Sequence, residues 1–247
     1  MNFEEIIMPA TVAEAYHALV TRENPVVIGG GGFIKLQKRR VTTAIDLSRC
    51  GLDAIHLTPE NIEVGAMVTL RTIETHEEMP RALKTAMRNI VGVALRNLVT
   101  VGGSVMGKYG FSDVITPLLA LDTHLEFHSK GRMSLEKFLQ SQDRTPDILV
   151  KLIVPRAAHS AFYNLQLTYT DFSMVNLAIA KNHHLRIAVG ARPGVARLLK
   201  DPNLHLSPQE ILEPLKFADD DKASGEYRRA LAETLLADAL KEVAQWK

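Results

Sequence analysis

The chain has 247 residues, of which 46% are hydrophobic, so it is long enough for one large domain or two ordinary domains with separate cores. Lys and Arg number 29 against 28 Asp and Glu, which excludes the charge excess typical of proteins that bind nucleic acid or anionic lipid. A single cysteine excludes an internal disulfide and an iron–sulfur cluster held by four thiolates of this chain. The sequence lacks a secretion signal and an apolar run of about 20 residues, so we expect a cytoplasmic protein without a membrane span.

The first fifty residues predict alternating helix and strand. Thr11 can cap a helix, because Glu14 follows three residues later as in a capping box, and this helix is expected to end near Asn24 and Pro25. The elements predicted next are a buried strand at 26–28, a short basic helix at 34–40 and a strand at 42–48.

The middle of the chain combines strands with helices. "AIHL" and "IEVGAM", joined by "TPEN", predict a hairpin, because Pro and Asn are turn residues between β-favouring runs. After Pro80, apolar residues recur at helical spacing as far as Ala94, and "LRNLVTVGGS" at 95–104 then predicts a strand that ends in glycines. The remaining predictions are a helix at 117–122, a strand at 123–128, a helix at 135–139 capped by Ser134 and a strand at 147–155.

We place a domain boundary near residues 155–160. Beyond it, three strands are predicted at 161–167, 173–180 and 185–191, followed by helices capped by Ser207 and Ser224. Asp219 to Asp221, before the last helix, read as a solvated loop, since the spacing of a calcium loop is missing. The predicted organisation is a domain at 1–155, with subdomains at about 1–53 and 54–155, and a second domain at 156–247.

Four consecutive glycines follow the predicted strand "VVI". They do not form the dinucleotide pattern G-x-G-x-x-G, because its third glycine would fall on Ile34 or on Lys35. A Rossmann phosphate loop is therefore not expected here.

A second glycine site contains an incomplete P-loop. "GGSVMGKY", residues 102–109, has the G-x-x-x-x-G-K spacing, but Tyr109 occupies the position where a Ser or Thr ligates magnesium. The pattern therefore argues against a nucleoside triphosphatase.

A third arrangement uses both glycine sites. Two glycine turns can hold one pyrophosphate from two sides, because each offers backbone N–H groups and no Cβ blocks the approach of the phosphates. For either loop alone a plain turn is the favoured interpretation, but four consecutive glycines exceed what a tight turn requires.

"VVIGGGGFI", "LRNLVTVGGSV" and "SDVITPLLALD", in this order, resemble the FAD-binding subunit or domain of molybdenum hydroxylases, a family that includes xanthine dehydrogenase and aerobic carbon monoxide dehydrogenase. "NIEVGAMVTLRTIE" and "SGEYRRALAETLLADAL" extend the resemblance over nearly the whole chain. It implies an α+β fold, in which a two-part FAD-binding α/β domain of the vanillyl-alcohol-oxidase-like type precedes a smaller domain of antiparallel sheet and helices.

The resemblance implies a set of cofactor-binding residues and neither a catalytic side chain nor a metal site. The resemblance places the two loops around the FAD pyrophosphate. It places Asp113 on the adenosine side, where the carboxylate accepts from ribose hydroxyls, and it packs the apolar side chains of Ile90 and Leu149 against the cofactor. The implied residues are Gly29, Gly30, Gly31, Gly32, Phe33, Thr100, Gly102, Gly103, Ser104, Asp113, Ile90 and Leu149. Gly31, Gly32 and Ser104 depart from the usual family residues, which leaves backbone donors in place of side-chain donors.

The implied function is that of an electron-transfer subunit. In the family, an iron–sulfur subunit passes electrons from a molybdopterin-binding large subunit to FAD, which reduces an acceptor. Two alternatives stay open from the residues: a self-contained FAD-dependent oxidoreductase, and a non-catalytic assembly subunit that has lost FAD.

Overall fold

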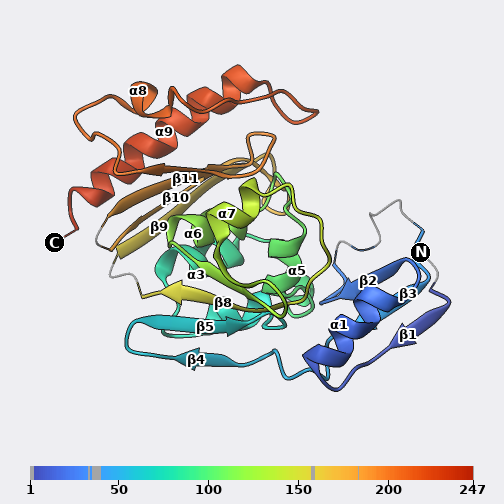
Figure 1. Ribbon diagram of the computed structural model, residues 1–247. Coiled ribbons are helices and arrows are strands. Elements are labelled where there is room, and N and C mark those ends of the chain that lie inside the picture. The colour runs from blue at the N-terminus through green and yellow to red at the C-terminus, as the bar shows by residue number, and fades with distance from the viewer. Residues whose placement is uncertain (1–2, 33, 35–39, 157–158, 183, 247) are drawn as a thin grey trace.

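The computed structural model describes residues 3–32, 34, 40–156, 159–182 and 184–246. Within these ranges the strands form three sheets, one after another along the chain (Figure 1). None of the described helices is long and apolar enough to cross a membrane. Phe33 and most of the predicted basic helix, residues 35–39, lie outside the described residues.

The N-terminal sheet is parallel and small. Its strand order is β1 (Glu5–Ile7), β3 (Thr43–Asp46) and β2 (Pro25–Ile28), and helix α1 (Val12–Thr21) packs beside it. The predicted Thr11 cap is confirmed, because the Thr11 side chain accepts a hydrogen bond from the Glu14 N–H. Strand β2 ends directly at the four glycines, which therefore lie at the carboxyl edge of a parallel sheet.

The second sheet is antiparallel and carries most of the helices. The strand order is β4 (Ile55–Leu57), β5 (Asn61–Gly65), β8 (Leu149–Pro155), β6 (His124–Phe127) and β7 (Gly131–Ser134). This confirms the predicted β4–β5 hairpin. The helices of this region are α2 (Leu70–Thr75), α3 (Arg81–Arg88), α4 (Val93–Arg96), α5 (Val101–Met106), α6 (Ile115–Ala120) and α7 (Leu135–Gln140).

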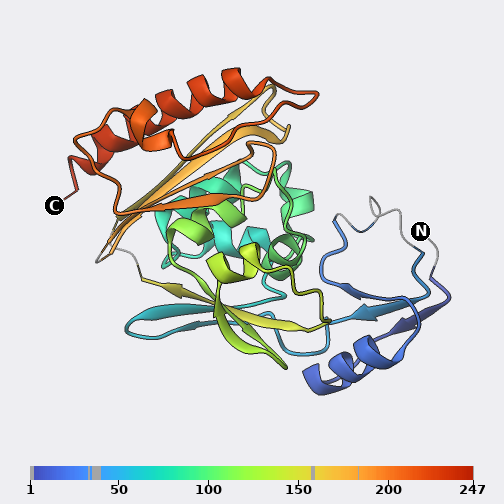
Figure 2. The same ribbon diagram turned by 45° about the horizontal axis from the view of Figure 1, so that its top comes forward.

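The third sheet is antiparallel, in the order β12 (Arg197–Lys200), β11 (Leu185–Gly190), β10 (Ser173–Lys181) and β9 (His159–Gln166). Figure 2 shows α8 (Pro208–Leu212) and α9 (Gly225–Val243) over one face and the helices of the middle region under the other. The side chains of β10 alternate accordingly: Leu177 and Ile179 pack in the core with α9, while Ala178 and Ala180 join the core of the middle region. Ser207 forms the predicted capping box.

Two predictions for the middle of the chain are wrong. The helix after Pro80 does not continue to Ala94, because Val91 has a φ of 39° and Gly92 is the N-cap of the separate helix α4. Residues 95–104 are not a strand: they comprise the end of α4, a short connection and the start of α5. Elements β1, α2, β7 and β12 were not predicted from the sequence.

Candidate functional site

The two glycine loops pack against each other. A Cβ on Gly30 would lie 1.4 Å from the carbonyl oxygen of Leu98, and a Cβ on Gly29 would lie 2.4 Å from the Thr100 hydroxyl oxygen. Such distances are far below van der Waals contact, so only glycine permits this approach. The first loop therefore needs two of its glycines to meet the second loop.

The rest of the first loop exposes backbone donors. Gly31 has a φ of +72° and no heavy atom within 4 Å of an added Cβ. Among the described residues, none accepts a hydrogen bond from the N–H groups of Gly30, Gly31 and Gly32. Consecutive N–H groups without a partner in a turn form a concavity that suits an anion.

The second loop is the start of helix α5, and its backbone donors are engaged within the chain. Val101 and Gly102 donate to the carbonyl oxygens of Val68 and Ala66, each at 2.9 Å. Gly103 donates to the Thr100 hydroxyl at 3.2 Å, and Ser104 donates to the Thr100 carbonyl at 3.1 Å. The expected row of free N–H groups is thus absent from this loop, because the helix and its neighbours use them.

A cleft of about 1130 Å³ runs along both loops. This volume slightly exceeds the usual range of small-molecule sites, about 300–1,000 Å³. The cleft collects most of the residues implied by the family resemblance: Gly29, Gly30, Gly31, Gly32, Thr100, Gly102, Gly103, Ser104 and Leu149. Its wall also carries the cationic side chains of Arg40, Lys108, Lys130 and Arg144, and Val195 from the third sheet region.

A smaller, mostly apolar pocket of about 50 Å³ lies next to the cleft and contains Ile90 and Asp113. Val99, Ser104 and Tyr109 line both spaces, so the two are adjacent. Asp113 and Ile90 therefore lie together, whereas Leu149 lies in the wide cleft.

Asp113 is 6% exposed, and its partners come from strand β10. One carboxylate oxygen, Oδ1, accepts hydrogen bonds from the Ser173 hydroxyl and the Asn176 amide, each at 2.6 Å. Burial raises the pKa of Asp113 to about 6, although these two hydrogen bonds lower it in part. No described residue donates to Oδ2, so that oxygen is available to a donor from a ligand.

An aromatic cluster forms part of the small pocket and was not predicted. The Tyr109 and Phe111 rings stack with centroids 5.3 Å apart, and the Phe111 and Phe172 centroids are 4.2 Å apart. Phe172 comes from the connection between β9 and β10, far away in sequence, so only Tyr109 and Phe111 gave a local signal as neighbouring aromatic residues. Lys108, the lysine of the incomplete P-loop, donates to the Phe138 carbonyl at 2.6 Å and lies over the ring of Phe138.

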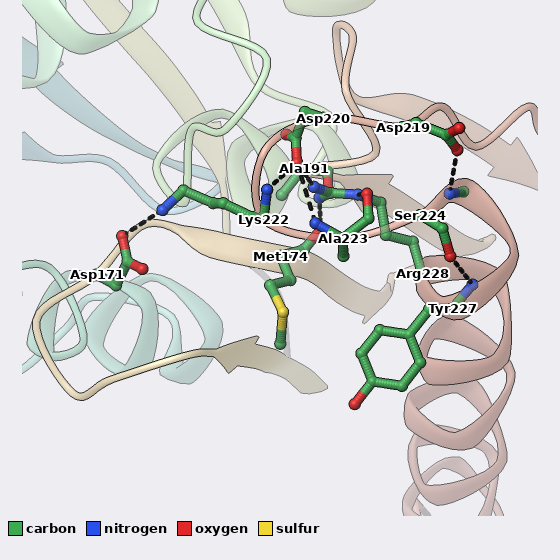
Figure 3. A network of polar contacts seen from close by, with 11 residues as sticks. Asp171, Met174, Ala191, Asp219, Asp220, Lys222, Ala223, Ser224, Tyr227 and Arg228 are labelled. Carbon is green, nitrogen blue, oxygen red and sulfur yellow. Dashed lines mark hydrogen bonds and ion pairs between the residues drawn. The ribbon is translucent and has the colours of Figure 1, made fainter.

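Asp171 also lines the small pocket, and a polar network connects it to helix α9 (Figure 3). Lys222 forms an ion pair with Asp171 at 2.6 Å. Arg228, 1% exposed, donates to the carbonyl oxygens of Met174 and Ala191 and forms an ion pair with Asp220. Asp220 is therefore not simply solvated, as the sequence suggested, but balances the charge of a buried arginine.

The fold is shared with known structures. The chain superposes on a chain of quinoline 2-oxidoreductase from Pseudomonas putida 86 with a TM-score of 0.87 at 21% identity, covering 99% of this chain and 98% of that one. Carbon monoxide dehydrogenase from Hydrogenophaga pseudoflava gives a TM-score of 0.85 at 20% identity over 97% and 96%. The fold is thus a mixed α/β fold shared with chains of these two enzymes.

Sequence similarity identifies the family. Residues 1–157 match the FAD-binding domain in molybdopterin dehydrogenase, and the chain belongs to this family, whose cofactor is FAD. YgfM from Escherichia coli (strain K12) is 26% identical over 98% of this chain and 97% of that protein. The FAD-subunit of nicotinate dehydrogenase from Eubacterium barkeri is 28% identical over 65% of this chain and 62% of that subunit.

Proposed function

We propose that this chain binds FAD non-covalently in the cleft, with the pyrophosphate against Gly30, Gly31 and Gly32. The observation that carries the proposal is that the backbone N–H groups of these residues have no acceptor among the described residues and that the residues line a cleft in a family that uses FAD. Backbone N–H groups neutralise phosphate oxygens without a lysine. Gly29 belongs to the same loop, and Phe33 follows it outside the described residues.

The second loop forms the opposite wall of the proposed pyrophosphate site. Gly102, Gly103 and Ser104 line the cleft at the start of α5, where hydrogen bonds within the chain hold their backbone in a fixed shape. The Thr100 hydroxyl accepts from Gly103 and retains its own hydrogen, so it can donate to a phosphate oxygen.

The two ends of an extended cofactor fit the two spaces. Leu149 packs on one ring system in the wide cleft, and Ile90 packs on the other in the apolar pocket, which is why these residues lie apart. The free Oδ2 of Asp113 accepts a hydrogen bond from a cofactor hydroxyl. The third sheet holds Asp113 through Ser173 and Asn176, so the domain proposed at 1–155 depends on the domain proposed at 156–247 to complete the site.

The proposed role is electron transfer within a molybdenum hydroxylase. Bound FAD supplies reversible transfer of electrons, while the protein binds and orients it. The proposed partners are an iron–sulfur subunit and a molybdopterin-binding large subunit. The proposal is supported by the name of one relative, the FAD-subunit of nicotinate dehydrogenase. The subtype proposed for the FAD-binding fold is the vanillyl-alcohol-oxidase-like one.

The visible spectrum of the purified chain tests the cofactor. We expect flavin absorption bands, either as purified or after addition of FAD and gel filtration. A chain without these bands after both treatments would be a subunit that has lost FAD, and the proposal would be wrong.

Purification of a tagged chain from its natural host tests the role. Co-elution of an iron–sulfur protein and a molybdenum protein is expected. If the single flavin-loaded chain instead oxidises a substrate with steady turnover, it is a self-contained oxidoreductase.

A further inference from the structure

A buried ion pair joins two helices that contribute residues to the apolar pocket. Arg96 at the end of α4 is 6% exposed by its side chain, and Glu74 of α2 is 7% exposed. The Arg96 Nε donates to the Glu74 carboxylate at 2.9 Å, and the Arg71 guanidinium lies 2.9 Å from the same oxygen. Burial raises the pKa of Glu74, but hydrogen bonds from Arg71 and Arg96 outweigh burial and lower it below its usual value, so the pair is ionised at neutral pH.

Arg96 uses its other donors on one turn of the backbone. Its Nη1 donates to the carbonyl oxygens of Ile90 at 2.7 Å and Val91 at 2.6 Å. Val91 has a φ of 39°, which is unfavourable for a β-branched residue and persists only where the surroundings hold it. The cationic guanidinium supplies that hold by binding two successive carbonyl groups.

The turn lines the pocket, and so do residues of the two helices that carry the ion pair. Ile90 and Val91 line the pocket, as does Leu95, the residue before Arg96. Leu70, which starts the helix that carries Glu74, lines it too. Arg96 and Glu74 therefore connect helix α2 with the contiguous residues 90–96, and both segments contribute apolar lining to the pocket.

Stability alone does not account for this arrangement. Taking two charges out of water costs several kcal/mol for each ion, and apolar residues of similar volume often stabilise a core equally well. The donors of Arg96 are instead aimed at the carbonyl groups of the pocket wall. We propose that Arg96 is a positioning residue of the FAD site, which holds Ile90 and Val91 in the backbone conformation that shapes the apolar pocket for a cofactor ring. This inference rests on the proposed function.

Four proteins separate positioning from stability: the full wild-type chain, Arg96→Met, Glu74→Gln, and the double variant Arg96→Met/Glu74→Gln. FAD is removed from each, the dissociation constant for added FAD is measured by fluorescence titration, and the free energy of unfolding is measured with urea. Arg96→Met should raise the dissociation constant for FAD and lower the free energy of unfolding, because it takes the donor from the turn and leaves Glu74 charged, buried and paired only with Arg71. Glu74→Gln keeps the donors of Arg96 on the turn, so its affinity for FAD should match that of the wild type.

The double variant decides the question. It removes the charge that Arg96→Met leaves behind, so stability should recover relative to that variant, while FAD binding should stay about tenfold weaker than in the wild type, since the two carbonyl groups still lack their donor. Wild-type affinity in the double variant would overturn the inference and reduce the pair to a structural contact. Failure of the wild-type chain itself to bind FAD would instead contradict the proposed function.

Arg96→Lys provides a second measurement if the methionine variants do not fold. Lysine keeps the charge but lacks the planar fork that reaches Glu74 and two carbonyl groups together. We expect a folded protein with weaker FAD binding and a visible flavin spectrum altered in band shape. An unchanged affinity and spectrum in this variant would equally overturn the positioning role.

Discussion

The two glycine loops meet in one cleft, yet they need glycine for different reasons. The first loop ends a parallel strand, and the N–H groups of Gly30 to Gly32 have no acceptor among the described residues. The second loop starts helix α5, and the N–H groups of Val101 to Ser104 all donate within the chain. Although both loops are rich in glycine, their roles therefore differ: the first loop offers N–H donors to an anion, and the second provides a wall of fixed shape.

The fixed shape of the second loop comes from the hairpin region before it. Val101 and Gly102 donate to the connection after β5, and Thr69 pairs with Thr100 in an isolated antiparallel bridge. A Cβ on Gly102 would lie 2.6 Å from the Ala66 carbonyl oxygen, so this glycine is required for packing and not for ligand approach. A wall held in this way is arranged before the cofactor arrives, which lowers the cost of binding.

The largest effect is expected for Gly30→Val. Its Cβ would meet the Leu98 carbonyl at 1.4 Å, so the two loops must separate. We expect a loss of about 3 kcal/mol in the free energy of unfolding, measured with urea, and loss of FAD on gel filtration. Retention of FAD with unchanged stability would show that the loops do not touch in this way.

The second variant, Gly102→Ala, tests the wall alone. Contact with the Ala66 carbonyl should lower the free energy of unfolding by about 1–3 kcal/mol and weaken FAD binding by moving the start of α5. Gly103→Ala is the matched control, because its Cβ would lie 3.2 Å from the Thr100 hydroxyl and alanine favours a helix by up to about 1 kcal/mol. If Gly103→Ala keeps its stability but loses FAD, Gly103 approaches the phosphate directly and the division between the loops is wrong.

How far the sequence predicted these loops depended on how local the signals were. The first loop follows a strand of β-branched residues, and both strand and loop position were predicted correctly. The second loop was predicted as the end of a strand because "LVTV" favours β structure, but Thr100 caps a six-residue helix. A helix this short has little local stability, so its tertiary bonds to Ala66 and Val68 decide the conformation.

The residues of the candidate site that belong to sequence motifs could be predicted. The residues that reach the site only because distant segments pack together could not. The resemblance brought out residues of both loops, and the structure places those it describes in one cleft. Val195 and Phe172 enter the site only because the third sheet packs against the middle region, where a Cβ on Gly110 would lie 2.9 Å from the Gly194 nitrogen. No local pattern in the sequence encodes that contact.

The third variant, Gly31→Val, tests the first loop without a clash. No heavy atom lies within 4 Å of the added Cβ, so the expected cost is the left-handed backbone at a φ of +72°, about 1–2 kcal/mol. Relaxation of the turn should also weaken FAD binding, measured by titration of the FAD-free protein. Gly31→Asn is the control, because asparagine tolerates this conformation, and it should bind FAD almost as the wild type does. Equal behaviour of the two variants would exclude backbone strain as the cause.

The smallest effect is expected at Thr100, where the two roles of the second loop can be separated. Thr100→Ala removes the acceptor for the Gly103 N–H and should cost about 1 kcal/mol in the free energy of unfolding, as for other N-cap residues. If the hydroxyl also donates to a phosphate, FAD affinity should fall about fivefold, the equivalent of one hydrogen bond, and Thr100→Ser should restore both properties. A loss of stability with unchanged FAD affinity would show that Thr100 only caps the helix. In that case the whole pyrophosphate contact would belong to the first loop, and the contrast between the two loops would be complete.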